Sequence, residues 1–152
     1  MQIDDRDRKI LSLLQADCRI SNAELAAQAG MSASACWRRV KALETAGIIE
    51  NYSVTLDPAR LGLTFHAIVL VHLARHDPDK IKDFIHAVQA RPEVQEVFAT
   101  TGQADYHLRV RCRDIEAYNR LLEDFLFRQP AVQSAQTNVV LREIKRARAG
   151  LM

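Results

Sequence analysis

The chain has 152 residues, 48% of them hydrophobic, and its 21 basic side chains nearly balance its 19 acidic ones. A chain of this size can bury one substantial core or two small ones. Because the net charge is only +2, overall charge does not indicate a nucleic-acid partner, and such a function must depend on where the charges are placed.

Cysteine usage and the apolar runs exclude several classes of protein. The three cysteines are widely spaced without a CxxC pair, which supports neither a disulfide framework nor a zinc site. The N-terminal sequence MQIDDRDRK lacks the apolar core of a signal peptide, and the longest apolar run, residues 67–71, is far too short to cross a bilayer. We therefore expect a cytoplasmic protein without membrane contact.

The first predicted helix covers about residues 4–15. Ile10, Leu13 and Leu14 form an apolar stripe along it at i, i+3 and i+4. Three aspartates lie near its start, where the helix dipole favours negative charge. This helix supplies one side of a small helical domain.

The next two helices are marked by their caps. Ser21 and Glu24 form a capping box, and Gly30 suits the left-handed conformation that ends a helix. Ser32 can cap a new helix only two residues later, and Gly47 stops it. So short a connection forces the sharp crossing of a helix-turn-helix unit.

The helix after Ser32 has one apolar face and one polar face. Its outward stripe contains Ser34, Arg38 and Lys41, while small residues at its start allow close approach to a DNA groove. Basic side chains there reach base edges or phosphates. The alternative is an ordinary solvated face. Predicted contacts to double-stranded DNA come from Ser21, Ser32, Ser34, Ala35, Arg38, Arg39 and Lys41.

Two further residues of this helix have competing interpretations. Trp37 flanks the outward stripe and can brace the helix against the core or lie along a DNA sugar; a lone tryptophan favours bracing. Cys36 lies on the inward stripe. It is better interpreted as a small buried hydrophobic residue than as a redox sensor.

Beyond Gly47 the sequence IIENYSVTLD alternates and ends in Asp57-Pro58, which predicts a short hairpin, or wing. Residues 1–57 therefore form a predicted winged helix-turn-helix domain. Residues 58–64, PARLGLT, form a predicted linker, and residues 65–152 a second domain.

The second domain is predicted to alternate strands and helices in the order βαββαβ. This is the ferredoxin-like arrangement, in which two helices cover one face of an antiparallel sheet, and it makes the whole chain α+β. The predicted elements are strand 65–74, helix 78–90, strands 94–101 and 105–113, a helix capped by Asp114, and strand 132–144.

The uncovered face of this sheet is predicted to be apolar at its centre. Ile68, Leu70, Val97 and Ala99 alternate with residues that would face the helices. A bare apolar sheet face usually finds a partner, which predicts a homodimer formed through the sheets. The alternative is that the wing and linker cover this face within one chain.

No GxSxG, HExxH, P-loop or paired-carboxylate motif is present, so the sequence predicts no enzyme activity, cofactor or metal site. His66 and His72 can share a sheet face, but no cysteine or acid stands at metal-ligand spacing. Two other functions stay open. One is an architectural protein that bends or wraps DNA without a ligand. The other is an enzyme or RNA-binding module, although these strands lack stacking aromatic residues.

Taken in order, these segments resemble a known family. The sequence IDDRDRKILSLLQADCRISNAELAAQAGMSASACWRRVKALETAGII resembles the DNA-binding half of the Lrp/AsnC, or feast/famine, family of bacterial and archaeal transcription regulators. The sequences TGQADYHLRV and PAVQSAQTNVVLREIK resemble its ligand-sensing half, the RAM domain. The resemblance implies a regulator of amino-acid metabolism or transport genes that binds promoter DNA as dimers, assembles further into tetramers or octamers, and responds to an amino acid.

The resemblance also implies an effector site beside the loop joining the second and third strands, between dimers. Backbone amides around Gly102 can hold an α-carboxylate, and Asp105 can pair with an α-ammonium group. Alternatively, Gly102 serves only the turn, Asp105 caps a strand and Tyr106 belongs to the core. The effector-binding residues implied are Thr101, Gly102, Gln103, Ala104, Asp105, Tyr106, Thr137, Asn138 and Val139.

Overall fold

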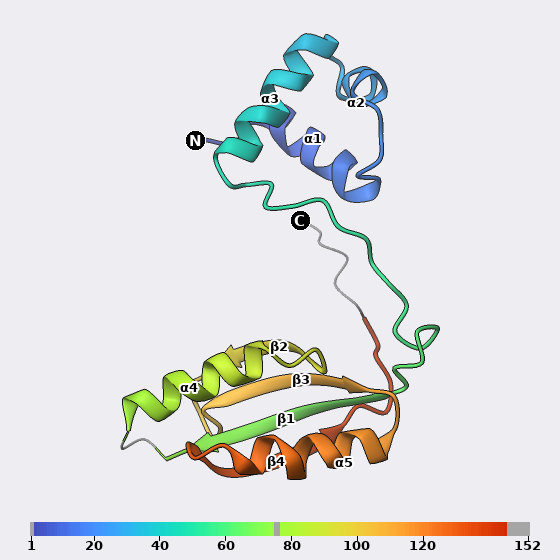
Figure 1. Ribbon diagram of the computed structural model, residues 1–152. Helices are drawn as coiled ribbons and strands as arrows, with labels where there is room; N and C mark the ends of the chain where they lie inside the picture. Colours follow the sequence, from blue (N-terminus) through green and yellow to red (C-terminus); the bar gives the residue numbers. More distant parts are fainter. Residues whose placement is uncertain (1, 75–76, 146–152) are drawn as a thin grey trace. The chain divides into compact units, whose positions relative to one another are not determined.

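The computed structural model of the chain describes residues 2–74 and 77–145. They form two compact units, one reaching to Thr55 and one comprising Leu56–Ile144. The first unit contains three helices, and the second a four-stranded sheet with helices (Figure 1). Each unit has its own hydrophobic core. None of the described helices is long and apolar enough to cross a membrane.

The three N-terminal helices agree with the sequence prediction to within about a residue at each end. They are α1 (Asp5–Ala16), α2 (Asn22–Ala29) and α3 (Ala33–Thr45). The predicted caps are also confirmed. Ser21 and Glu24 form a capping box, Gly30 ends α2 with φ of 66°, and the Ser32 side chain accepts a hydrogen bond from the first turn of α3.

The core of the helical unit is made by apolar residues on the inward faces of the three helices. Ile10 of α1, Leu25 of α2, and Cys36 and Leu43 of α3 are almost completely buried. Burial raises the pKa of the Cys36 thiol, so the unreactive thiol form dominates at neutral pH. The interpretation of Cys36 as a small core residue is confirmed.

A charged link joins the start of α1 to the middle of α3. The Arg39 guanidinium donates to Asp7 at 2.7 Å and to Asp4 at 2.8 Å, and only 3% of the Asp7 side chain is exposed. Asp4 and Asp7 also form the capping box of α1. The hydrogen bond from the Asp7 backbone N–H, together with Arg39, lowers the pKa of the Asp4 carboxyl.

The hairpin predicted over residues 48–57 is wrong. Residues 50–56 are in neither strand nor helix, and all of them are exposed. A hairpin needs a second strand to pair its backbone groups, and no described residue provides one here. Asp57 instead begins a turn, in which its carboxylate accepts the N–H groups of Ala59 and Arg60.

The second unit has the predicted βαββαβ order. The strand order is β2-β3-β1-β4 and every pairing is antiparallel, so α4 crosses over β3 on its way from β1 to β2. The elements are β1 (Phe65–Leu73), α4 (Pro78–Gln89), β2 (Val94–Ala99), β3 (Tyr106–Cys112), α5 (Ile115–Asp124), a 3-10 turn (Leu126–Arg128) and β4 (Val132–Val139).

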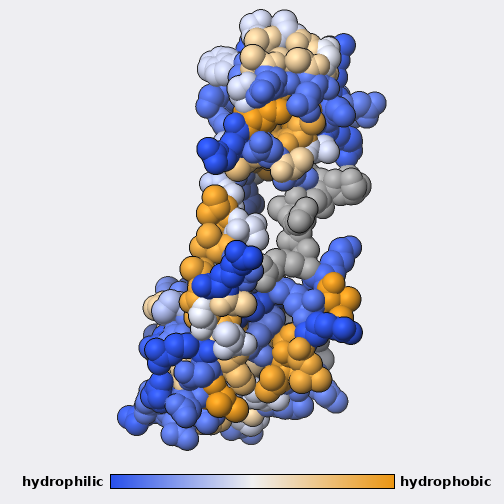
Figure 2. Space-filling model, turned by 90° about the vertical axis from the view of Figure 1, so that its right-hand side faces the viewer, coloured by the Kyte–Doolittle hydropathy of each residue, from blue (hydrophilic) through white to orange (hydrophobic). Residues whose placement is uncertain are grey.

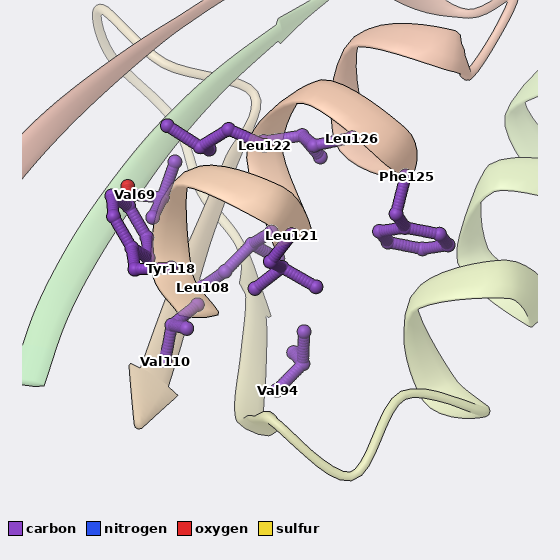
Figure 3. Close-up of a pocket in the computed structure, with 9 residues that line it drawn as sticks. All are labelled: Val69, Val94, Leu108, Val110, Tyr118, Leu121, Leu122, Phe125 and Leu126. Atoms are coloured by element: carbon purple, nitrogen blue, oxygen red, sulfur yellow. The ribbon is translucent and has the colours of Figure 1, made fainter. Parts of the chain in front are cut away.

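Both helices cover the same face of the sheet. Val69 and Val71 of β1 pack in one core with Phe84 of α4 and Tyr118 of α5. Beneath α5 this core leaves an apolar cavity, whose lining is drawn in Figure 3. Its volume is about 10 Å³, room for no more than one water molecule, so it cannot hold an amino acid.

The last strand is shorter than the predicted 132–144. Val139 lies opposite Ala67, and one further hydrogen bond joins the Val140 N–H to the His66 carbonyl. Because β1 begins at Phe65, the partner strand ends there, and β4 has nothing more to pair with. Leu141 and Ile144 are 96% and 78% exposed.

The uncovered face is less apolar than predicted. Val97 lies opposite the buried Leu108, and Ala99 opposite Tyr106, so both belong to the face that the helices cover. Placing them with Ile68 and Leu70 on the open face was wrong. The reason is that cross-strand register, rather than alternation within one strand, decides which face a residue joins.

Charged and aromatic side chains occupy the open face beside Ile68 and Leu70. Arg109 contacts Glu96 at 2.8 Å and Glu143 at 3.8 Å, and Arg111 contacts Glu143 at 2.9 Å. Three histidines and a phenylalanine also belong to the open face, because they alternate with core residues along a strand or pair with open-face residues of the next strand. They are His66, His72, Phe98 and His107.

The charged link predicts that Arg39 stabilises the helical unit. Arg39→Ala leaves the buried Asp7 carboxylate without its counter-charge, and we expect the thermal midpoint of unfolding to fall by roughly 5–10 °C. Arg38→Ala, which removes the adjacent exposed arginine, is the control and should change the midpoint little. Equal midpoints for the two variants in thermal unfolding followed by circular dichroism would contradict a structural role for Arg39.

Candidate functional site

The turn between α2 and α3 is held by side chains of both helices. The Asn22 amide donates to the Ala33 carbonyl at 3.0 Å, which joins the first residue of α2 to the first residue of α3. The hydroxyls of Ser21 and Ser32 accept backbone N–H groups of Glu24 and Ala35. Ser21 and Ser32, two of the three serines predicted to contact DNA, are thus helix caps, and they help to fix the angle at which α3 is presented.

The outward stripe of α3 is exposed as predicted. Ser34, Arg38 and Lys41 are exposed, and Ala35 is half-buried. Arg38 forms no ion pair or side-chain hydrogen bond with the described residues. Lys41 contacts Glu44 one turn later at 2.6 Å, but both side chains are accessible to water, and exposed pairs of this kind are weak.

Tyr52 forms a hydrogen bond with the second carboxylate oxygen of Glu44, the one that Lys41 does not contact. Its hydroxyl donates to the Glu44 carboxylate at 2.9 Å. Partial burial, with this hydrogen bond to a negative charge, raises the pKa of Tyr52 to about 12. The hydrogen bond from Lys41, followed by that from Tyr52, lowers the pKa of Glu44. Glu44 therefore stays ionised at neutral pH and offsets part of the Lys41 charge, whereas no acidic side chain among the described residues pairs with Arg38.

Arg39 has a different environment from the other predicted DNA-binding residues. Its guanidinium is directed to Asp4 and Asp7 of α1, and these two acids raise its pKa. Its positive charge is already balanced within the unit. Arg39 is thus placed to orient α3 rather than to attract a phosphate.

Trp37 does not brace α3 against the core. It is 55% exposed, and it is absent from the cluster of residues that form the helical core. The bracing interpretation is wrong because Cys36, Val40 and Leu43 already occupy the inward face, and Trp37 follows Ser34 on the outward side. Helical periodicity alone places Trp37 on the outward side of α3. The bracing prediction instead followed the general preference of tryptophan for burial.

The loop between β2 and β3 is closed by its own hydrogen bonds. The Thr100 hydroxyl donates to the Ala104 carbonyl at 2.9 Å, and the Thr100 N–H donates to the Asp105 carbonyl at 3.0 Å. Ala104 is 3% exposed, whereas Thr101, Gly102 and Gln103 are exposed. The exposed part of the loop is therefore the part that a ligand can reach.

Asp105 and Tyr106 have structural contacts of their own. The Asp105 carboxylate accepts the Leu73 N–H at 2.9 Å, at the end of β1. The Tyr106 ring lies edge-on to Phe84, with ring centroids 5.6 Å apart. Gly102 has φ of 121°, a conformation that side chains rarely adopt, and a Cβ built there meets only open space. The alternative roles of these residues therefore have physical support: Gly102 in the turn, Asp105 at the end of a strand and Tyr106 in the core.

A single chain does not bring all the predicted effector-binding residues together. Thr137, Asn138 and Val139 pair with the first half of β1, from Val69 to Ala67, whereas Tyr106 pairs with Val71 on the other side of that strand. Ala67, opposite Val139, lies four residues or roughly 13 Å along β1 from Val71, and Val69, opposite Thr137, lies two residues from it. The strand β1 also lies between β4 and β3. Thr137 is also engaged with the Tyr118 hydroxyl.

The described residues contain no group of three histidine, cysteine or acidic side chains that could hold a metal ion. The geometry instead presents two separate features. One is an exposed helix whose Arg38 has no counter-charge among the residues that the structure describes, and the other is a loop with a positive-φ glycine beside a carboxylate.

Comparison with protein families matches both units. A model described as winged helix-turn-helix DNA-binding matches residues 3–50. A model described as the Lrp/AsnC ligand binding domain matches residues 66–150. The two matches occur in the order that the sequence resemblance implies.

Proteins of similar sequence cover almost the whole chain. The leucine-responsive regulatory proteins of Klebsiella pneumoniae and of Escherichia coli K12 are each 40% identical to it over 145 residues. The aligned region is 95% of this chain and 88% of each relative.

Solved structures agree over the same range. A transcriptional regulator from Neisseria meningitidis, in complex with L-methionine, has a TM-score of 0.92 and 38% identity, covering 95% of this chain and 94% of that one. The AsnC structure from E. coli has a TM-score of 0.89 and 28% identity, covering 97% of each chain. A feast or famine regulatory protein from M. tuberculosis, complexed with L-methionine, has a TM-score of 0.85 and 29% identity, covering 95% of this chain and 96% of that one.

These relatives are transcription regulators rather than enzymes, and they match this chain in sequence, fold and domain order. The chain belongs to the Lrp/AsnC family of transcription regulators.

Proposed function

We propose that this protein is a sequence-specific transcription regulator that binds promoter DNA through α3 and alters that binding when an amino acid occupies the second unit. The observation that carries the DNA half is the exposed, uncompensated Arg38 on the second helix of a helix-turn-helix. The effector half is supported by relatives whose solved structures hold L-methionine and by others named for their response to leucine. The genes it controls are those of amino-acid metabolism or transport, and it acts in the cytoplasm, where promoter DNA is accessible.

The residues of the helix-turn-helix are proposed to have different roles in DNA binding. Arg38 and Lys41 lie one turn apart on the same stripe, and Lys41 can exchange Glu44 for a phosphate because their pair is exposed. Ser34 and Ala35 allow the helix to approach the bases closely. Ser21, Ser32 and Arg39 act by positioning α3.

The effector site is proposed to lie at the β2–β3 loop. The exposed amides around Gly102 suit a carboxylate, and Asp105 lies beside them. Since Thr137, Asn138 and Val139 are remote from this loop within one chain, a site that uses both groups must combine two copies. Effector binding is then coupled to assembly, because a ligand shifts an equilibrium by its differential affinity for the two states.

A homodimer formed through the open sheet face is proposed as the building block, with tetramers or octamers as further assemblies. Ile68 and Leu70 lie at the centre of that face, and Phe98 is 53% exposed. Figure 2 shows apolar surface on the sheet-bearing unit and along the connecting segment, where Val54 and Leu56 are exposed. Exposed apolar patches of this kind mark protein interfaces. A ligand-independent architectural role is not favoured, because related structures hold an amino acid.

The first test concerns DNA binding. Arg38→Ala should weaken binding to a selected operator about 5- to 150-fold, the range for losing one base contact, and should relax the preference at that base pair. Lys41→Ala should lower the slope of log affinity against log salt by about 0.9, because one phosphate contact is lost. Lys82→Ala, which removes an exposed cation from α4, is the control. Unchanged operator affinity in both α3 variants would contradict the proposal.

The second test separates sensing from DNA binding. Asp105→Asn keeps an oxygen that can accept the Leu73 N–H but removes the charge, so effector affinity should fall at least tenfold while DNA binding without effector is unchanged. Gly102→Ala should act in the same direction through backbone strain. Calorimetry with leucine and methionine measures this, and Asp79→Asn on α4 is the control. Wild-type effector affinity in both loop variants would place the site elsewhere.

The third test concerns assembly. Leu70→Glu puts a charge at the centre of the open face, and it should convert the dimer into a folded monomer because a buried unpaired carboxylate is costly. Ile115→Glu introduces the same change at an exposed position of α5 and should leave the dimer intact. Light scattering measures the mass of each variant. A dimeric Leu70→Glu variant would show that copies associate through another surface.

A further inference from the structure

Trp37 is an exposed aromatic side chain in the middle of the predicted DNA-reading surface. It is the only tryptophan of the chain, and 55% of it is accessible to solvent. An indole can bury about 150–250 Å² of largely apolar surface. An indole exposed on this face of α3 is therefore available to pack against a partner of the helix.

The neighbours of Trp37 on α3 identify the kind of partner. Ser34 precedes it by one turn and Lys41 follows it by one turn, so all three lie on one stripe together with Arg38. Arg38 is adjacent, exposed and without a counter-charge among the described residues. A surface that combines an apolar plane with an uncompensated cation and small residues fits a polyanion that also offers apolar groups, rather than the apolar face of a protein.

Duplex DNA offers such a group in its major groove. The C5 methyl of thymine projects into the groove, and apolar side chains on a reading helix contact it. We propose that Trp37 is a specificity-determining residue that reads a thymine by packing its indole against the C5 methyl, while Arg38 contacts an adjacent base or phosphate. This inference rests on the proposed DNA-binding function and adds the base type that α3 recognises.

The experiment uses the full-length protein and a duplex selected by the wild-type protein from a random-sequence pool. Each thymine of the selected duplex is replaced in turn by uracil, which removes only the methyl group. At one position per half-site, wild-type binding should weaken about fourfold, which corresponds to about 0.8 kcal/mol for one buried methyl group.

A double-mutant comparison then assigns the effect. Trp37→Ala should bind the thymine duplex more weakly than the wild-type protein does. Replacing thymine by uracil should then weaken the binding of Trp37→Ala no further, because the indole that contacts the methyl group is already gone. Trp37→Phe keeps an apolar ring and should retain part of the methyl dependence. Because Trp37 is exposed, both variants should unfold at the wild-type temperature, and circular dichroism checks this. Ala42→Ser, an exposed change on the adjacent face of α3, is the matched control and should retain the full methyl dependence.

The tryptophan itself provides a second readout. In the free protein its fluorescence should be quenched by acrylamide, and the selected duplex should protect it, whereas a shuffled duplex of equal length should protect it less. Wild-type affinity and an unchanged uracil profile in Trp37→Ala would overturn the inference. An equal loss on thymine and uracil duplexes would also overturn it, in favour of packing against deoxyribose.

The outcome is distinguishable from failure of the DNA-binding proposal. If the wild-type protein selects no duplex, the proposed function fails. If it selects one, and Arg38→Ala weakens binding while Trp37→Ala does not, only the role of Trp37 fails.

Discussion

The contact of Arg39 with the buried Asp7 carboxylate determines how the helical unit presents its reading surface. Arg39 and Arg38 are neighbours in sequence, yet one guanidinium is held by two acids of α1 and the other is free of ion pairs with the described residues. This anchor at the middle of α3 acts together with the apolar stripe of the helix to set the rotation of α3 about its own axis. That rotation sends Cys36 and Leu43 inward and leaves Trp37 and Arg38 outside. Of the two neighbouring arginines, Arg39 thus anchors α3 to α1, and Arg38 is left exposed for contact with DNA.

The second unit depends in a similar way on one strand. β1 pairs with both β3 and β4, so its register fixes the position of these two strands, and β3 in turn places β2. It places the β2–β3 loop at the end of β1 and Thr137–Val139 along its first half. The same register carries Val97 into the core and leaves Arg109 and Arg111 on the open face beside Ile68 and Leu70. A site that needs both the loop and the last strand is therefore incomplete in one copy, which connects ligand recognition to association.

Much of the fold followed from local signals. The capping box at Ser21, the glycine at position 30 and the cap at Ser32 act over three or four residues, and for this reason the helix boundaries were predictable. A run of residues that favour strands likewise located β1 to within a residue. The hairpin over residues 48–57 was predicted from alternation and did not form, because a strand requires a partner and the described chain supplies none. A local pattern shows that a segment can form a strand, but the segment forms one only where another strand pairs with its backbone.

By itself, the amino-acid sequence determined the helix-turn-helix, the βαββαβ order, the core identity of Cys36 and the outward stripe of α3, since each depends on residues close together in the chain. Only the tertiary structure decided that Arg39 is an anchor, that Val97 lies under the helices and that β4 ends at Val139. Each of these depends on a contact, or on the lack of one, between residues far apart in sequence. The Arg39–Asp7 pair joins residues 32 apart, and no periodicity within a single element carries information over that distance.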